Sequence, residues 1–265
     1  MRVVVDGCGC FPTGRHYAGI AHLLRAVVRG LADEFASDSV WSDVPVAVID
    51  VETTGRDASV DRVVEVGIVV GRHGDVVARY NWLINPGIPI PAEVQQVHHI
   101  SDDDVKDSPR FHEIAHEIAA ALAGCIPAAY NAAFDRAFLA NEFARNAQSA
   151  SADTKVAAAP GAGDAGGGDG KTAPALRRDV DWIDPLVWAR EIHKEEKSKA
   201  LGEVAQRLGV ALENAHRAND DAEAALRVLY RLAADARVPR TYGAIMQEQR
   251  RLALLQSDER RFWKN

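Results

Sequence analysis

In the first half of the chain, some apolar stretches have the pattern of β-strands and others have helical spacing. Residues 45–55 read PVAVIDVETTG, a short apolar run ending in acids, which is typical of a buried β-strand. Residues 62–86 contain two β-rich runs joined around His73, Gly74 and Asp75, where a tight turn is favoured. The pattern predicts one strand followed by an antiparallel hairpin.

A helix, a strand and a second helix are expected next. Residues 111–124 repeat apolar side chains at helical spacing and end in a glycine. They lead into the strand-like CIPAAYNA at 125–132 and then into a helix over 133–147. Since a helical crossover returns the chain in the same direction, the new strand is predicted to run parallel to the first.

Two segments are expected to lie outside this compact unit. Residues 16–36 carry apolar side chains at helical spacing, which predicts an amphipathic helix within an N-terminal extension, 1–43. Residues 147–178 are rich in Ala, Gly, Ser and Asp. Such a composition cannot bury enough surface to offset its ordering entropy, so it predicts a flexible insertion.

The last part of the chain is predicted to be helical. Asp184 and Pro185 have the character of a helix N-cap and a first-turn proline. Helices are expected at 186–194, 200–208 and 217–235, so that the main domain covers 44–235 and a charged helical tail covers 236–265.

Composition narrows the class of protein. At 265 residues with 47% hydrophobic content, the chain can bury one substantial core. A formal net charge of -7 excludes a protein that coats nucleic acid through a broad basic surface, but not an enzyme that grips only a strand end. Three cysteines, no signal-peptide pattern and no apolar run of membrane-spanning length predict a cytoplasmic protein with no membrane partner.

Acidic side chains stand where the predicted strands end. Asp50 and Glu52 are two residues apart on a strand, so both side chains point to one face and could share a metal ion. Asp135 follows the parallel strand and opens the next helix. If the two strands are neighbours, Asp135 lies near the first two acids; alternatively, it only favours the dipole of the helix it begins.

A histidine and another acid open the last strong helix. His216 and Asp221 stand five residues apart in HRANDDA. A histidine just before a helix and an acid in its first turns can border one pocket. Glu65 lies inside the second predicted strand, where it could support a metal site from behind or simply face an edge.

In the order IDVETTG, NAAFD and HRANDDA, these motifs resemble those of the DEDDh exonucleases, the family of polymerase proofreading subunits, RNase T and oligoribonuclease. The resemblance covers residues 44–233 and implies an α/β, RNase H-like fold with a central mixed five-stranded sheet flanked by helices. The segment INPGIPIPAEVQQVHHISDDDV resembles the family's proline-rich loop, with His98 in the place of the family histidine and His99 in that of a glycine.

The resemblance also implies the chemistry. Two Mg²⁺ or Mn²⁺ ions would be held by the carboxylates, since hard cations prefer oxygen ligands, and His216 would act as general base. The implied metal ligands are Asp50, Glu52, Asp135 and Asp221. The implied substrate contacts are Thr53, Thr54, Gly55, His98, Asn131 and Phe134, of which His98 and Phe134 are candidates to stack on terminal bases. Plain core packing is an equal alternative for Phe134.

These features predict a 3′-to-5′ exonuclease that releases nucleoside monophosphates from single-stranded DNA, either as a proofreader or as a free-standing repair enzyme. An exoribonuclease that trims short RNA and a non-catalytic domain that binds nucleic acid or a polymerase are the alternatives. Nucleic-acid 3′ ends are the expected partners, and a DNA polymerase or sliding clamp is a further candidate. The sequence leaves the oligomeric state open.

Overall fold

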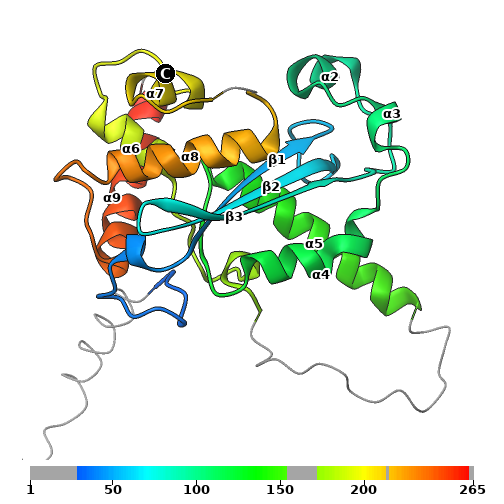
Figure 1. Cartoon of the computed structure of the whole chain (residues 1–265), viewed down its shortest axis with the longest axis horizontal. Coiled ribbons are helices and arrows are strands. Elements are labelled where there is room, and N and C mark those ends of the chain that lie inside the picture. The colour runs from blue at the N-terminus through cyan, green and yellow to red at the C-terminus, as the bar shows by residue number, and fades with distance from the viewer. Residues whose placement is uncertain (1–28, 154–171, 213–214, 263–265) are drawn as a thin grey trace, which may run out of the picture.

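The computed structural model describes residues 29–153, 172–212 and 215–262. Within these ranges a mixed sheet is covered by helices on both faces (Figure 1). None of the described helices combines the length and the hydropathy that crossing a bilayer requires.

The sheet has four strands in the order β3-β2-β1-β4. The strands are β1 (Val46–Thr53), β2 (Val63–Arg72), β3 (Asp75–Leu83) and β4 (Ile126–Ala128). β2 pairs with both β1 and β3 in antiparallel fashion, whereas β4 runs parallel to β1. The predicted first strand, the hairpin and the parallel crossover are all confirmed.

The prediction of five strands is wrong by one. Ile183 lies beside β4, where its main chain exchanges hydrogen bonds with Pro127 (2.9 Å) and Ala129 (3.0 Å). This contact is an isolated parallel bridge, so the segment occupies the fifth position without forming a ladder. Asp184 follows immediately as the N-cap of a helix, which ends the extended segment after one paired residue.

Different helices cover the two faces of the sheet. Val46 and Val48 of β1 pack into a core with α8, whereas Ala47, Ile49 and Val51 pack into a second core with α4 and α5. Figure 1 shows α8 crossing one face, with α4 and α5 on the other. The helices of these layers are α4 (Phe111–Leu122), α5 (Ala133–Asp153), α6 (Pro185–Ile192), α7 (Leu201–Arg207), α8 (Ala218–Leu232) and α9 (Tyr242–Phe262).

The proline-rich loop contains two short helices, α2 (Ala92–His98) and α3 (Asp102–Val105). His99 ends α2 in the left-handed conformation, with φ 59° and ψ 26°. Glycine adopts this conformation without strain. His99, which stands where the family has a glycine, adopts the same backbone geometry.

The predicted flexible insertion at 147–178 is wrong at both ends. α5 continues to Asp153, and the chain returns with the 3₁₀ helix η2 (Pro174–Leu176). Ala173 and Ala175 on this return are buried in the α4–α5 core, which the alanine-rich composition did not indicate. The centre of the insertion, 154–171, lies outside the described residues.

The predicted N-terminal helix over 16–36 falls mostly outside the described residues. Its last part, 29–36, is not helical. Gly30 has a φ of 74° and forms a parallel bridge with Val180, and a turn follows, closed by a hydrogen bond from Phe35 N–H to the carbonyl of Ala32. The 3₁₀ helix η1 (Trp41–Asp43) follows before β1.

Candidate active site

Strand β1 delivers two carboxylates to one end of the sheet. Side chains alternate between the two faces of a strand, and those of Val46 and Val48 point towards α8. Asp50 and Glu52 therefore lie on the same face of β1 as these valines. In the antiparallel ladder, Glu52 stands opposite Glu65 of β2, and the register shifts immediately afterwards. The shift ends regular pairing directly after the second acid.

Asp135 reaches the same place from the other side of β1. It lies in the first turn of α5, with 3% of its surface exposed, and its Oδ1 accepts a hydrogen bond from the main-chain N–H of Val51 at 3.1 Å. Val51 stands between Asp50 and Glu52 in the strand. The structure therefore brings the third predicted acid to the first two.

The start of α8 supplies the remaining two side chains. The main-chain N–H of His216 donates to Oδ2 of Asp221 at 2.9 Å, and His216 has a φ of 68°. Glu52, His216 and Asp221 each offer a ligand atom within 4.8 Å of the other two, a spacing that could hold a metal ion. Asp50 and Asp135 fall outside this group of three.

Buried Glu65 fixes the start of α8 against the sheet. Its carboxylate accepts hydrogen bonds from the main-chain N–H of Ala218 (3.1 Å), from Nη2 of Arg217 (2.7 Å) and from Nδ2 of Asn81 (2.9 Å). At Gly67, a Cβ would stand 2.3 Å from the carbonyl carbon of Ala218. Of the two sequence interpretations of Glu65, support from behind the site fits and an edge-facing acid does not. The signal in the sequence is a single acid inside VVEVGIVV.

The carboxylates of the site repel one another. Burial, and then the charges of Asp135 and Glu52, raise the pKa of Asp50 well above its usual value. Burial, followed by the charges of Asp221 and Glu65, raises the pKa of Glu52 to about 8. The pKa of Asp135 and that of Asp221 are also raised, in both cases mainly by burial. A cluster of acids that resists ionisation is suited to a cation, because a divalent ion would offset the repulsion.

The loop after β1 is held by internal contacts. Thr53 and Thr54 are buried, the hydroxyl of Thr53 donates to the carbonyl of Gly55 at 2.5 Å, and the hydroxyl of Thr54 accepts from Arg62 N–H at 3.0 Å. A Cβ at Gly55 would lie 2.3 Å from the carboxylate of Asp61. The side chains of these threonines are thus engaged within the protein, which leaves the main chain as the candidate substrate contact.

His98 does not lie where a base could stack on it. Its side chain is 2% exposed, and Nδ1 accepts a hydrogen bond from the main-chain N–H of Ile100 at 3.0 Å. Burial lowers the pKa of His98, which favours the neutral ring. The expected stacking role therefore disagrees with the structure, because helix α2 turns the ring inward.

Phe134 and Asn131 remain near the site. Phe134 is half-buried against Phe138, with ring centroids 4.8 Å apart, so it packs in the core and keeps part of its surface accessible. Asn131 is exposed and has a φ of 68°, and its main-chain N–H donates to Oδ1 of Asp184 at 3.0 Å.

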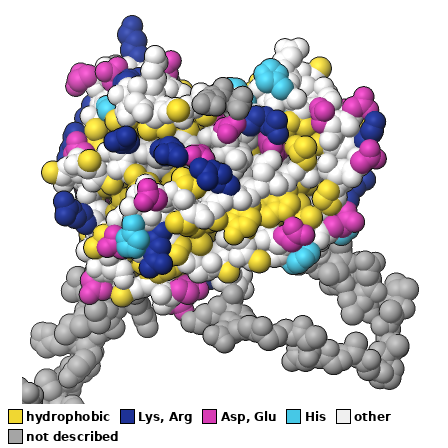
Figure 2. Space-filling model, in the orientation of Figure 1, with side chains coloured by type: hydrophobic (Ala, Val, Ile, Leu, Met, Phe, Trp, Pro, Cys, Tyr) yellow, Lys and Arg dark blue, Asp and Glu magenta, His cyan; other side chains and the backbone are white. Residues whose placement is uncertain are grey.

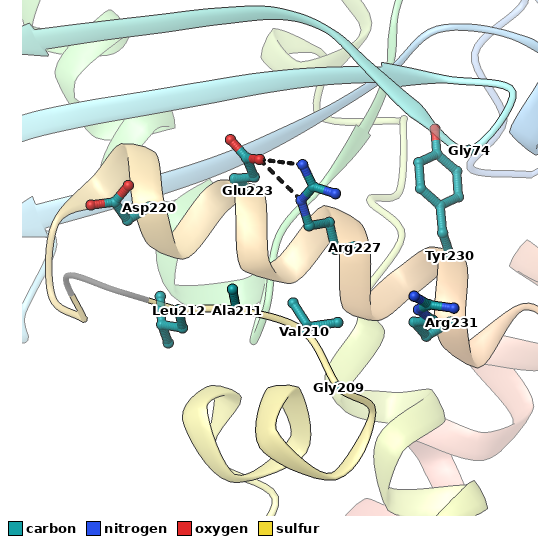
Figure 3. A pocket seen from close by; sticks show the side chains of 10 residues that line it. All are labelled: Gly74, Gly209, Val210, Ala211, Leu212, Asp220, Glu223, Arg227, Tyr230 and Arg231. Atoms are coloured by element: carbon teal, nitrogen blue, oxygen red, sulfur yellow. Dashed lines mark hydrogen bonds and ion pairs between the residues drawn. The ribbon is translucent and has the colours of Figure 1, made fainter.

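A separate cavity of about 730 Å³ lies between α8 and the segment 209–212 (Figure 3). None of the five candidate catalytic side chains lines it. Of its lining residues, Glu223 accepts from Arg227 at 2.6 Å, and it also accepts from Arg79 at 2.6 Å. Because Glu52, His216, Asp221 and Asp135 lie at the end of β1, we place the candidate site there and not in this cavity.

The visible surface agrees with the acidic composition. On the face shown in Figure 2, Lys and Arg side chains are scattered among acidic and apolar ones, without a continuous basic area over the described residues. Exposed apolar side chains on β3 include Val77 and Tyr80.

Comparisons with known proteins match most of this chain. The family model described as Exonuclease, RNase_T, matches residues 47–229. A DNA polymerase III PolC-type of Streptococcus pneumoniae is 31% identical over 189 residues, which cover 71% of this chain and 11% of that protein. A 3′-5′ exonuclease DinG of Staphylococcus saprophyticus is 29% identical over 176 residues, covering 66% of this chain and 17% of that one. The chain thus spans about a tenth of the polymerase relatives it matches.

Solved structures show the same fold. Exonuclease X in complex with 5′ overhanging duplex DNA matches with a TM-score of 0.53 and 19% identity, over 76% of this chain and 98% of that chain. The zinc-bound E. coli ExoI–ssDNA complex matches with a TM-score of 0.56 and 16% identity, over 72% of this chain and 41% of that one.

Proposed function

The chain belongs to the exonuclease family whose model covers residues 47–229, and on that premise we propose that it is a metal-dependent 3′-to-5′ exonuclease acting on single-stranded DNA. The observation that carries the proposal is the meeting of three distant segments at one end of β1. Glu52, His216 and Asp221 offer ligand atoms within 4.8 Å of one another, while Asp135 is hydrogen-bonded to the strand between Asp50 and Glu52.

The donor set fits hard divalent cations. Four carboxylates, without a cysteine among them, are the ligand types that suit Mg²⁺ or Mn²⁺, and the imidazole of His216 is left for proton transfer. The residues that would hold two such ions are Asp50, Glu52, Asp135 and Asp221. When bound, the ions would supply an activated water and charge stabilisation for the departing 3′ oxygen.

The chain's own groups would complete the reaction. His216 is exposed at the rim of the site, so its ring can accept a proton from the attacking water and release it to solvent. The carboxylate of Glu52 and the main chain at Thr53 would receive the terminal 3′ hydroxyl, which makes the enzyme end-specific. Phe134, which is half-buried, would stack on a terminal base of any sequence.

Single-stranded DNA is favoured because the relatives include DNA polymerase III proteins, and two structural neighbours contain DNA. On the same ground we infer a polymerase as the candidate partner. A contact with a sliding clamp, and a cytoplasmic location, stay predictions.

The test uses purified protein with 5′-labelled DNA and RNA oligonucleotides in Mg²⁺, Mn²⁺ or EDTA. We expect a ladder shortened from the 3′ end with metal, and none with EDTA or in Asp50→Ala. Faster degradation of RNA would make the enzyme an exoribonuclease, and tight binding without cleavage would make it a non-catalytic domain. Internal cleavage, or equal rates on a 3′-phosphorylated end, would contradict the mechanism.

A further inference from the structure

Helix α9 lies outside the family match, yet one of its side chains is hydrogen-bonded to residues 182–184, the segment beside β4. Gln249 is 7% exposed. Its Nε2 donates to the carbonyl of Trp182 at 2.8 Å, and its Oε1 accepts from the main-chain N–H of Asp184 at 2.8 Å. One buried amide thus forms hydrogen bonds with the main chain on both sides of Ile183, the residue that bridges to β4.

Asp184 passes this constraint to the loop between β4 and α5. Its carboxylate accepts hydrogen bonds from the main-chain N–H groups of Asn131 (3.0 Å), Ala132 (3.2 Å) and Leu186 (2.9 Å). Asn131 holds a left-handed backbone, φ 68°, which persists only where surrounding contacts fix it. The aspartate therefore holds the turn that starts α5.

This turn sets the position of Asp135, a proposed metal ligand. Asp135 follows Ala132 by three residues, in the first turn of α5, and is hydrogen-bonded to the main-chain N–H of Val51. Hydrogen bonds thus link α9 to Asp184 and Asp184 to the turn, and the backbone from the turn to Asp135 completes the path to β1. At the two ends of this path Gln249 and Asp135 are buried, so moving either one would leave a buried polar atom unpaired.

We propose that Gln249 is a positioning residue for the active site, acting through Asp184 to fix Asp135. The inference rests on the proposed function in its last step only. α9 is anchored independently by the buried side chains of Tyr242, Ile245 and Met246, so the fold does not depend on the amide. Loss of Gln249 is therefore expected to loosen the 131–135 turn and leave the helix in place.

The chain offers a matched control on the same helix. Nε2 of Gln256 donates to the carbonyl of Val187 in α6 at 2.9 Å, one turn away from the segment that Gln249 holds. Gln249→Met and Gln256→Met each remove an amide and keep the length of the side chain. Gln249→Glu is the conservative variant, because it retains an acceptor for the N–H of Asp184.

The first measurement is hydrogen–deuterium exchange in the metal-free protein. In Gln249→Met we expect faster exchange at the amides of Asn131, Ala132 and Val51, and unchanged exchange at Ile68 in the centre of β2. Gln249→Glu is expected to be intermediate. Gln256→Met is expected to leave the amides of the turn as in the wild type.

The second measurement is steady-state kinetics on a single-stranded DNA oligonucleotide. We expect kcat of Gln249→Met to fall about tenfold with KM within about twofold, the lower end of the effects seen for groups that orient metal ligands. The Mn²⁺ dissociation constant from calorimetry should rise in the same variant.

The outcomes separate the two proposals. A wild-type protein without nuclease activity would refute the proposed function, while the exchange pattern would still test the path to Val51. Unchanged exchange and kcat in Gln249→Met, or the same changes in Gln256→Met, would overturn the positioning role. So would loss of the fold in both Gln249 variants, because it would make the amide a general stabilising contact.

Discussion

Charge on Glu52 opposes folding of the metal-free protein in a pH-dependent way. Burial, followed by the charges of Asp221 and Glu65, raises the pKa of Glu52 from 4.5 to about 8. Below pH 4.5 the carboxyl is protonated in the folded and the unfolded chain, so it does not affect stability. As the pH rises from 4.5 towards 8, the unfolded chain releases the proton and the folded chain retains it, so the free energy of unfolding falls. Above about pH 8 both states are ionised, and the free energy of unfolding does not fall further.

The magnitude follows from the difference between the two pKa values. At about 1.4 kcal/mol for each pH unit, full burial would cost roughly 5 kcal/mol. Glu52 is partly exposed, and water screens its charge, so we expect about 2 kcal/mol. Metal-free Glu52→Gln should therefore be more stable than the wild type by about 2 kcal/mol at pH 9, and by less than about 0.5 kcal/mol at pH 5.

The assay is urea denaturation in EDTA at both pH values, followed by tryptophan fluorescence. Trp182 and Trp188 are buried, so unfolding changes their environment. The same variant should lose nuclease activity in Mg²⁺. An equal gain of stability at the two pH values, or a loss at pH 9, would refute the argument, because the effect would not come from ionisation.

Glu65, the register partner of Glu52, is the matched control. Burial alone would raise its pKa, but hydrogen bonds from Arg217, Asn81 and Ala218 outweigh burial and lower it. Its ionised form therefore adds stability above its ordinary pKa, and this stability is lost as the pH falls through the lowered value. Glu65→Gln should destabilise the protein by about 1 to 3 kcal/mol at pH 9, opposite in sign to Glu52→Gln.

Three further predictions concern the site. His216→Ala should lower kcat about a hundredfold or more at pH 7.5, roughly the contribution of a general base, while Kd for single-stranded DNA from fluorescence anisotropy stays constant. Gly67→Ala should cost about 3 kcal/mol of unfolding free energy by urea titration, because its Cβ would meet the main chain of Ala218 at 2.3 Å. Saturating Mg²⁺ should raise the wild-type Tm by about 5 °C at about pH 8.5 and by less than about 1 °C at about pH 5.5, since only ionised carboxylates bind it; equal shifts in scanning fluorimetry would contradict this.

Local patterns were sufficient to predict most of the sheet. The apolar runs of β1 and β2 are nearly continuous, as expected of buried strands, so these strands could be recognised from short stretches. The five candidate catalytic side chains stay predictions, and the structure brings Glu52, His216 and Asp221 within 4.8 Å of one another. The family resemblance is confirmed by the match over 47–229.

Properties that depend on distant contacts could not be predicted in the same way. The inward turn of His98 follows from the packing of α2, and the burial of Ala173 and Ala175 follows from a core that the alanine-rich segment only completes. The role of Glu65 depends on a helix that begins about 150 residues later, and no local spacing connects them.

The core around α8 also limits where this chain can be divided. Tyr242, Ile245 and Met246 are fully buried in it, and the hydroxyl of Tyr242 accepts a hydrogen bond from the main chain of Ala32 at 3.0 Å. A shortened chain ending at residue 229, where the family match ends, would expose this apolar surface to water and invite aggregation. We therefore expect that a soluble protein needs both flanking segments, although sequence comparison recognises only the shorter stretch between them.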